Sequence, residues 1–347
     1  MSFKKHTSTK RPNIELPRGF RTSPLSSQTI TSSGSESLDY YLLGGIPSKS
    51  LIVIEEQGTT DYASVFLKTY AAEGLLQGHA VWLGPNIGPA WFRTLPDQHS
   101  KPSRTVKHPD NQSPRTTDSM KIAWRYQSLK KAEKKFVENV PDGFTHSFSF
   151  TKHLPLSTEM KFAASRLPFE SGSNPYAVVL QDLSQFLSQL PSGSVCRLVL
   201  PSLLSPAFYP IHASKPMHFV RFIHSLLALI KCTTSIHLTC MCSVPITLFS
   251  RDCEQTFWLE NLASCAISLH PFEVKQEHER DPTDKTQGLL KIHKLPLPLP
   301  FTEKPNTDEA GDLAFTMSKR HITIEPWVLP PIVDNQEQKK TNKNIDF

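Results

Sequence analysis

Residues 54–62, with the sequence IEEQGTTDY, occupy the position of a loop that could bind the phosphates of a nucleotide. They follow the apolar run SLIVI and precede ASVFLKTYAAEGLL, whose apolar residues recur at helical spacing. A strand, a glycine-containing turn and a helix, in that order, are the context of a phosphate loop. In such a loop, backbone amides and a lysine hold the phosphates, and a hydroxyl binds magnesium. The chemistry to consider is therefore nucleotide binding and hydrolysis.

The side chains that this chemistry requires are missing from the matching positions. Gly58 keeps one glycine and Thr59 and Thr60 follow, but Asp61 replaces the lysine and Tyr62 replaces the magnesium-binding hydroxyl. Two unit charges about 4 Å apart interact by roughly 4 kcal/mol at an effective dielectric constant near 20, so an aspartate repels phosphate about as strongly as a lysine attracts it. Asp61 instead suits a helix N-cap, where its carboxylate accepts backbone hydrogen bonds in the place of a phosphate.

A second position supports the same interpretation. ATP-hydrolysing proteins of this layout end a later apolar strand in an aspartate that holds magnesium. The matching stretch here is CRLVLPSLLSP, and Pro201, which has no side-chain oxygen, follows LVL. The sequence also lacks GxSxG, HExxH and the Gly-rich dinucleotide fingerprint, and its cysteines and histidines show no metal-ligand spacing. We therefore expect no catalytic residue, no cofactor, no metal site and no ATP turnover by this chain alone.

Composition and charge suggest an intracellular protein with a possible anionic partner. The net charge is +6 and the isoelectric point is about 8.9, which makes an anionic partner plausible, although a merely solvated surface explains the balance as well. Six cysteines show no disulfide framework, and the start MSFKKHTSTKRPNIEL has no apolar signal-peptide core. The most apolar stretch, residues 219–249, is interrupted by charged residues and a proline, so we expect no membrane span. These features fit a reducing, intracellular compartment.

The order of elements predicts an α/β fold with a mostly parallel central sheet, flanking helices and late antiparallel strands. We expect a disordered tail at 1–30, one domain at 31–332 with a flexible insertion at 97–118, and a second disordered tail at 333–347. A short helix should end at Gly44 and Gly45. The strand at 51–54, the helix after Tyr62 and the strand at 79–84 should form a βαβ unit. Further strands are expected at 176–181, 196–204, 235–244 and 265–272, and a helix at 219–230. Residues 288–301 and 321–331 are expected to form late edge strands or extended segments limited by proline.

Basic residues are concentrated in and after the predicted insertion. The candidates for contact with RNA phosphates are Arg125, Lys130, Lys131, Lys134 and Lys135. Trp124 and Tyr126 flank Arg125, and aromatic stacking beside positive charge is typical of single-stranded RNA recognition. A solvated basic face is an equally good explanation, and the two aromatic residues could instead face the core.

Several segments together resemble the PAXNEB family, which comprises the fourth subunit of the Elongator complex. They are TSSGSESLDYYLLGGIP, IEEQGTTDYASVFLKTYAAEGLLQGHAVWLG, MKIAWRY, FTHSFSFTKHL and LVLPSLLSP, and the resemblance extends from about residue 31 to about residue 331. It implies a RecA-like fold and a ring of six, with two copies each of the fourth, fifth and sixth subunits, which binds tRNA. It also implies association with the catalytic subunits, whose chemistry modifies the wobble uridine (U34) of certain tRNAs and belongs to the third subunit.

The leading hypothesis is therefore a non-catalytic, RecA-like ring subunit that helps to recruit tRNA. One alternative is a divergent NTPase whose catalytic residues come partly from a neighbour across the ring interface. Another is a purely structural scaffold without RNA contact. Nucleotide binding by the isolated chain would favour the enzyme, and salt-sensitive RNA binding that is lost on ring disassembly would favour the leading hypothesis.

Overall fold

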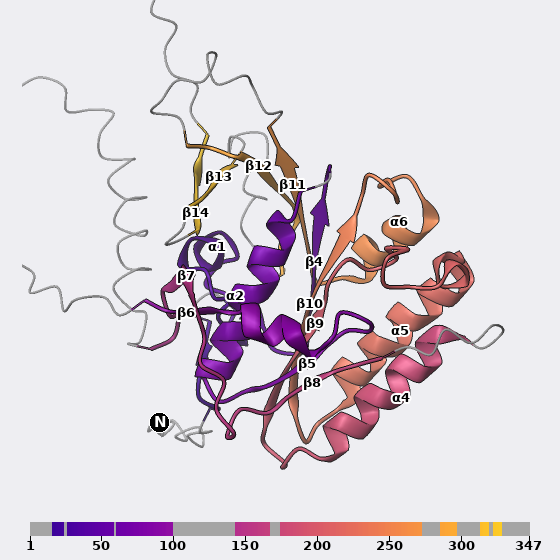
Figure 1. The fold of residues 1–347 in the computed structure, drawn as a ribbon, viewed down its shortest axis with the longest axis horizontal. Coiled ribbons are helices and arrows are strands. Elements are labelled where there is room, and N and C mark those ends of the chain that lie inside the picture. The colour runs from indigo at the N-terminus through magenta and orange to yellow at the C-terminus, as the bar shows by residue number, and fades with distance from the viewer. Residues whose placement is uncertain are drawn as a thin grey trace, which may run out of the picture.

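The computed structural model describes residues 16–23, 26–58, 60–99, 143–166, 174–272, 285–296, 313–318 and 322–327. Its centre is a nine-stranded sheet (Figure 1). In spatial order the strands are β14 (Ile322–Pro326), β13 (Leu313–Met317), β12 (Gly288–Lys294), β11 (Cys265–Pro271), β4 (Leu51–Glu56), β10 (His237–Pro245), β9 (Val195–Leu200), β5 (Ala80–Leu83) and β8 (Phe162–Ala164). Neighbours from β11 to β8 pair in parallel, and those from β11 to β14 pair antiparallel.

Helices cover both faces of this sheet (Figure 1). They are α1 (Glu36–Tyr41) and α2 (Tyr62–Leu76) on one face, and α4 (Pro175–Ser188), α5 (Pro216–Cys232) and α6 (Glu254–Leu262) on the other. Because successive strand side chains point to opposite faces, β4 contributes to both cores. Leu51 and Val53 pack with α4, α5 and α6, whereas Ile52 and Ile54 pack with α1 and α2. Among the described helices, none is long and apolar enough to cross a membrane.

Two smaller sheets lie beside the central one. Strands β1 (Phe20–Thr22), β2 (Thr29–Thr31) and β3 (Ile46–Pro47) form an antiparallel sheet near α2, and β6 (Pro96–Gln98) pairs with β7 (Phe148–His153). The buried Arg197 of β9 joins the first of these sheets to α2, because its guanidinium donates to Thr31 Oγ1, to the Ser32 carbonyl and to the Tyr70 carbonyl. Short 3-10 turns at Pro89–Thr94 (η1) and Ile211–Ser214 (η2) complete the ordered elements.

The predicted fold class is confirmed at the level of its architecture: an α/β fold with a mostly parallel sheet, flanking helices and late antiparallel strands. The strand at 51–54, the helix after Tyr62 and the strand at 79–84 correspond to β4, α2 and β5, and the helix at 219–230 lies within α5. The predicted βαβ unit needs one correction. β4 and β5 lie in the same sheet with β10 and β9 between them, so they do not pair with each other.

Other predictions were wrong. Residues 176–181 belong to α4, because Pro175 opens a helix capped by the Asn174 side chain, and Tyr176, Val179 and Leu183 then lie buried at helical spacing. β12 is not an edge strand, since β13, which we had not predicted, pairs with its outer side. Helix α6 had also not been predicted.

The predicted domain boundaries also change. Ordered structure begins within the supposed tail at 1–30: β1 and β2 pair there, and the Phe20 ring packs against His79 and His237. Within the supposed insertion at 97–118, Asp97 and Gln98 belong to β6 and pair with β7. Residues 100–118 of that segment and the predicted tail at 333–347 lie outside the described residues.

Candidate functional site

The candidate site lies where the parallel strands β4 and β10 end, on the edge of the sheet where α/β proteins bind their ligands. β4 ends at Glu56, Gln57 and Gly58 follow, and α2 begins at Tyr62. Thr59 lies outside the described residues. The segment therefore has the strand–turn–helix context of a phosphate loop, and its contacts determine whether it could hold phosphate.

A carboxylate of the chain itself occupies the start of α2. Glu56 Oε1 accepts hydrogen bonds from Thr60 Oγ1 at 3.0 Å and from the Ala63 amide at 3.2 Å. Burial, assisted by the charge of Asp61, raises the pKa of Glu56 above its ordinary value, although hydrogen bonds from the Ala63 amide, the Thr60 hydroxyl and the Tyr62 amide oppose this. The N-terminus of a helix attracts anions through its free amides and its dipole. Glu56 therefore fills the position that a bound phosphate would take.

The prediction that the Asp61 carboxylate accepts the capping hydrogen bonds of α2 was wrong. Asp61 is the N-cap residue of α2, but its side chain accepts no capping hydrogen bond within the described part of the chain. Tyr62, which stands at the position of the magnesium-binding hydroxyl, makes a contact with the late strands instead. Its ring packs edge-on against Phe315 of β13, with the ring centroids 5.1 Å apart. Glu56, which the sequence analysis did not single out, provides the cap.

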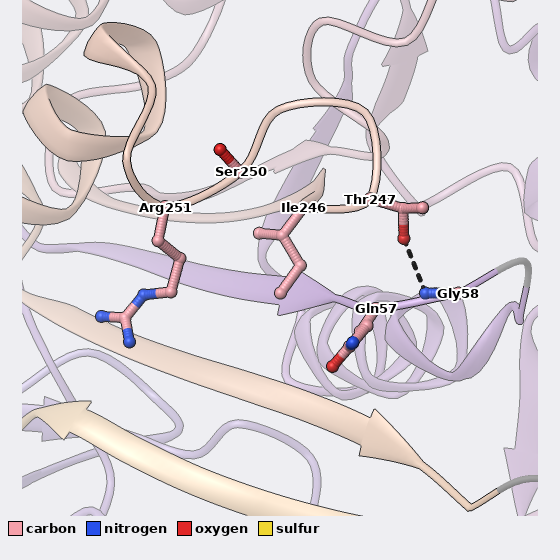
Figure 2. Close-up of a pocket in the computed structure, with 6 residues that line it drawn as sticks. All are labelled: Gln57, Gly58, Ile246, Thr247, Ser250 and Arg251. Atoms are coloured by element: carbon pink, nitrogen blue, oxygen red, sulfur yellow. Dashed lines mark hydrogen bonds between the residues drawn. The ribbon is translucent and has the colours of Figure 1, made fainter.

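The backbone amide of Gly58, the remaining glycine of the loop, also has a hydrogen-bond partner within the protein. Gly58 has a positive φ of 85°, a backbone conformation that favours glycine. Its amide donates to Thr247 Oγ1 at 2.7 Å, as Figure 2 shows. Thr247 lies in the segment that follows β10, residues 246–253, which we call the β10–α6 loop. The amide that could contact a phosphate is therefore bound to a side chain of the protein.

Pro201 directly follows β9, where we had expected the lost acidic position. The turn after it is held by β10: the Ser202 amide donates to Ser243 Oγ at 2.8 Å and the Leu203 amide to the Ser243 carbonyl at 2.7 Å. Pro201 therefore lies at the carboxyl edge of the sheet and has no side-chain oxygen that could bind a cation. The RNA candidates Arg125, Lys130, Lys131, Lys134 and Lys135 lie outside the described residues.

A pocket of about 320 Å³ opens beside the loop (Figure 2). It is lined by Gln57, Gly58, Ile246, Thr247, Ser250 and Arg251. Arg251 is the cationic member of this lining, but its charge is already compensated. Its Nε and Nη2 atoms donate to both carboxylate oxygens of Glu260 at 2.8 and 2.7 Å, and its Nε lies 3.3 Å from Glu55 Oε2. The pocket therefore offers no unpaired positive charge to a phosphate group.

Sequence reasoning missed Glu55, Glu56, Thr247 and Arg251. For the two glutamates a signal existed, since two acids at the end of a buried strand must point to opposite faces of the sheet. For Thr247 and Arg251 no local signal existed, because they follow the loop by about 190 residues and meet it only through the pairing of β4 with β10.

Comparisons with known proteins find relatives that match almost the whole chain. The model of the PAXNEB protein family matches residues 13–346. Elongator complex protein 4 of Schizosaccharomyces pombe is 54% identical, with 100% of both chains covered. The Xenopus laevis protein of the same name is 28% identical over 99% of this chain and 90% of its own length, and that of Saccharomyces cerevisiae is 26% identical over 92% and 77%. A solved KaiC-like protein of Pyrococcus horikoshii aligns with a TM-score of 0.44 at 13% identity, covering 86% of this chain and 100% of its own.

Proposed function

The chain belongs to the PAXNEB family, and from that membership we propose that it is a non-catalytic subunit of the Elongator complex. In this proposal it forms a ring of six chains with the fifth and sixth subunits, the ring binds tRNA, and the catalytic subunits modify the wobble uridine. Its place of action would be the cytoplasm and the nucleus. The relatives named Elongator complex protein 4 support membership of the complex.

The observation that carries the non-catalytic role is the occupied phosphate position. Glu56 accepts the hydrogen bonds at the start of α2, and Thr247 takes the Gly58 amide. A nucleotide would have to displace both contacts and then face the Glu56 and Asp61 carboxylates. Like charges about 4 Å apart repel by roughly 4 kcal/mol at an effective dielectric constant near 20, so binding at this loop is strongly disfavoured.

Exposed apolar side chains near the same edge support assembly with other proteins. Phe257 and Trp258 of α6 are 53% and 43% exposed, and their rings lie edge to face with centroids 5.8 Å apart. The start of α6 contacts η2 through a hydrogen bond from Gln255 Nε2 to the Ser214 carbonyl. Close by in sequence, Ile211, Met217 and Leu248 are also exposed. Exposed large apolar groups of this kind are typical of protein-binding surfaces.

The experiment that tests this function is purification of the tagged, full-length chain from its own cells. Copurifying proteins would be identified by mass spectrometry, copurifying RNA by sequencing, and particle mass by sedimentation. We expect two further Elongator subunits in equal amounts, the mass of a six-chain particle, and tRNA. A well-behaved monomer that does not associate with those subunits would contradict the proposal.

Nucleotide turnover provides a second test. We expect no ATP hydrolysis by the purified chain alone. Hydrolysis that disappears in Asp61→Ala would contradict a non-catalytic role. Hydrolysis by the assembled ring alone, abolished by substitution of this loop, would instead support a composite site shared with a neighbouring subunit.

A further inference from the structure

Glu55 is a buried carboxyl group to which no described residue donates a hydrogen bond. It lies on β4 between Val244 of β10 and Ser268 of β11, on the face of the sheet that α6 covers. The side chain is wholly buried, and neither carboxylate oxygen accepts a hydrogen bond from any residue that the structure describes. An ionised carboxylate in that setting carries a large desolvation cost, whereas a neutral carboxyl group does not.

The guanidinium of Arg251, which lies next to Glu55, donates its hydrogen bonds to Glu260. Arg251 donates two hydrogen bonds to Glu260, and its Nη1 lies 3.2 Å from His293 Nδ1. Its Nε is 3.3 Å from Glu55 Oε2, close enough for attraction but without hydrogen-bond geometry. One arginine therefore faces two carboxyl groups and satisfies only Glu260.

The other groups around Glu55 do not supply a second positive charge. Partial burial and the nearby Arg251 lower the pKa of His293 to about 4, so that it is neutral near pH 7. Lys294 extends to the Asn261 carbonyl at the end of α6 and not to a carboxylate. The charged and titratable groups of the surrounding elements include Arg251 and Asp252 of the β10–α6 loop, Glu254 and Glu260 of α6, His270 of β11, and Lys291, His293 and Lys294 of β12. Of these, His293 Nε2 lies 4.0 Å from Glu55 Oε2.

Two carboxyl groups lie beside a single arginine, and they can coexist if Glu55 is neutral. Its O–H can then donate a hydrogen bond to the Glu260 carboxylate. Burial, followed by this hydrogen bond and by the charge of Glu260, raises the pKa of Glu55 to about 8, against a smaller opposing effect of Arg251.

We propose that Glu55 and Glu260 share one proton beside Arg251, and that loss of this proton loosens the β10–α6 loop at the pocket. An ionised Glu55 competes with Glu260 for Arg251, which must then divide its hydrogen bonds between two carboxylates. Arg251 belongs to the same loop as Thr247, whose hydroxyl holds the Gly58 amide. The protonation of one buried pair is therefore coupled to the position of the loop that lines the pocket.

The first test measures the proton directly on the full-length chain. Infrared spectra of the wild type should show a protonated carboxyl band near pH 7 that is lost by about pH 9 and is absent from Glu55→Gln. Asp39, whose pKa burial raises to about 6, has released its proton before this range. The exposed Glu159, in the segment between β7 and β8, provides the control Glu159→Gln, which should retain the band. A band that persists in Glu55→Gln would overturn the proposal.

The second test uses the pH dependence of unfolding. The pKa of Glu55 is raised from 4.5 to about 8 on folding, so its stabilising effect is complete below pH 4.5 and is lost as pH rises to about 8. Within that window the unfolding constant of the wild type should rise about tenfold per pH unit relative to Glu55→Gln, and the difference should be constant above it. Glu260→Gln, which leaves Arg251 to Glu55, should weaken this dependence. A ratio between wild type and Glu55→Gln that does not change with pH would contradict the shared proton.

The third test follows the loop. Trp258 precedes Glu260 by two residues on α6, so fluorotryptophan incorporated into the full-length chain reports on this region by fluorine NMR, with its signal assigned from Trp258→Phe. We expect the wild-type signal to shift with a midpoint near pH 8, and the Glu55→Gln signal to remain fixed. A Trp258 signal that does not change across this range in the wild type would overturn the coupling to the loop.

Discussion

The Glu56 carboxylate lies 3.2 Å from the Ala63 amide and accepts its hydrogen bond at the start of α2. The last residue of a strand thus caps the helix that follows it, across a loop that in nucleotide-binding proteins would enclose a phosphate. Thr60 Oγ1 donates to the same carboxylate oxygen, so the loop is tied to the strand as well. A side chain that belongs to the chain itself therefore replaces the ligand as the stabilising anion.

Replacing Glu56 with Ala should destabilise the protein by about 0.5–2 kcal/mol, the usual range for the loss of a helix cap. The matched substitution Asp61→Ala should cost less, because Asp61 makes no capping hydrogen bond and contributes only its charge at the helix start. Chemical unfolding of both variants gives the comparison. A larger loss for Asp61→Ala would mean that Asp61, and not Glu56, stabilises α2.

The buried Arg197 leads to a second prediction, at Gly74 of α2. A Cβ atom added at Gly74 would lie 2.6 Å from Arg197 Cδ. Glycine-to-alanine changes inside a helix usually stabilise by about 0.5–1 kcal/mol. Here we expect Gly74→Ala to destabilise by about 1–3 kcal/mol through overpacking, because hydrogen bonds to Ser32, Tyr70 and Thr31 fix the position of the arginine.

A double-mutant cycle tests the cause of that loss. Arg197→Met should itself destabilise, by about 1–3 kcal/mol for a buried acceptor that is left without its hydrogen bond. In that background Gly74→Ala should lose most of its cost, since the clashing side chain is gone. Strictly additive losses would indicate that Gly74 is required for a reason other than its contact with Arg197.

A third prediction concerns Asp39 of α1, which accepts hydrogen bonds from Ser32 Oγ, the Ser33 amide and Thr145 Oγ1. Burial, assisted by the charge of Glu73, raises its pKa from 3.8 to about 6 despite these hydrogen bonds. A raised pKa in the folded state means that the stabilising effect of Asp39 is complete below pH 3.8 and is lost as pH rises to about 6. The loss is on the order of 3 kcal/mol, from about 1.4 kcal/mol per pKa unit.

Asp39→Asn should remove this pH dependence and retain the fold, because the amide can accept from Ser33 and donate to the two hydroxyl groups. The measurement is the free energy of unfolding of wild type and variant at about pH 4 and pH 7. The wild type should lose stability relative to Asp39→Asn between these two values. A difference that is equal at both would contradict the raised pKa.

The sequence predicted the parallel core of this fold because the signals there are local. β4, α2, β5 and α5 show continuous apolar runs or helical periodicity within a single segment. The error at α4 arose from a short window, since Tyr176–Leu180 looks β-branched and apolar until Leu183 and Leu187 extend it at helical spacing. β1 and β2 looked like a polar tail, because the contacts that order them, Arg197 to Thr31 and Phe20 to His79, come from distant segments.

The candidate site could likewise be predicted only where its signals are local in the sequence. Loss of the lysine and the hydroxyl could be recognised from Asp61 and Tyr62, because the motif is contiguous. The group that replaces the phosphate could not be recognised from the sequence. The choice between Asp61 and Glu56 depends on which carboxylate reaches the Ala63 amide in the folded protein. The Glu55–Arg251–Glu260 cluster depends on three elements whose proximity exists only in the folded sheet.

The last prediction concerns RNA and rests on the proposed function. Replacing Lys130, Lys131, Lys134 and Lys135 with Gln should weaken tRNA binding by the assembled ring, if these side chains bind phosphate. Each lysine that no longer binds a phosphate leaves the counterions of that phosphate in place. The slope of log affinity against log salt should therefore become shallower by nearly one unit for each phosphate-binding lysine that is replaced.

The measurement is a tRNA titration of wild-type and variant rings at several salt concentrations. The charge-matched control replaces four exposed lysines of the described structure with Gln, namely Lys152, Lys161, Lys215 and Lys231. Because both variants lose four positive charges, long-range attraction falls by a similar amount in each, and only the removal of direct lysine–phosphate pairs should change the salt slope of one and not the other. Equal affinity and equal slope in the wild type and the 130–135 variant would place the RNA site elsewhere and leave this segment as a solvated basic face. A change of the same size in both variants would show that net charge alone, without phosphate binding by this segment, accounts for the affinity.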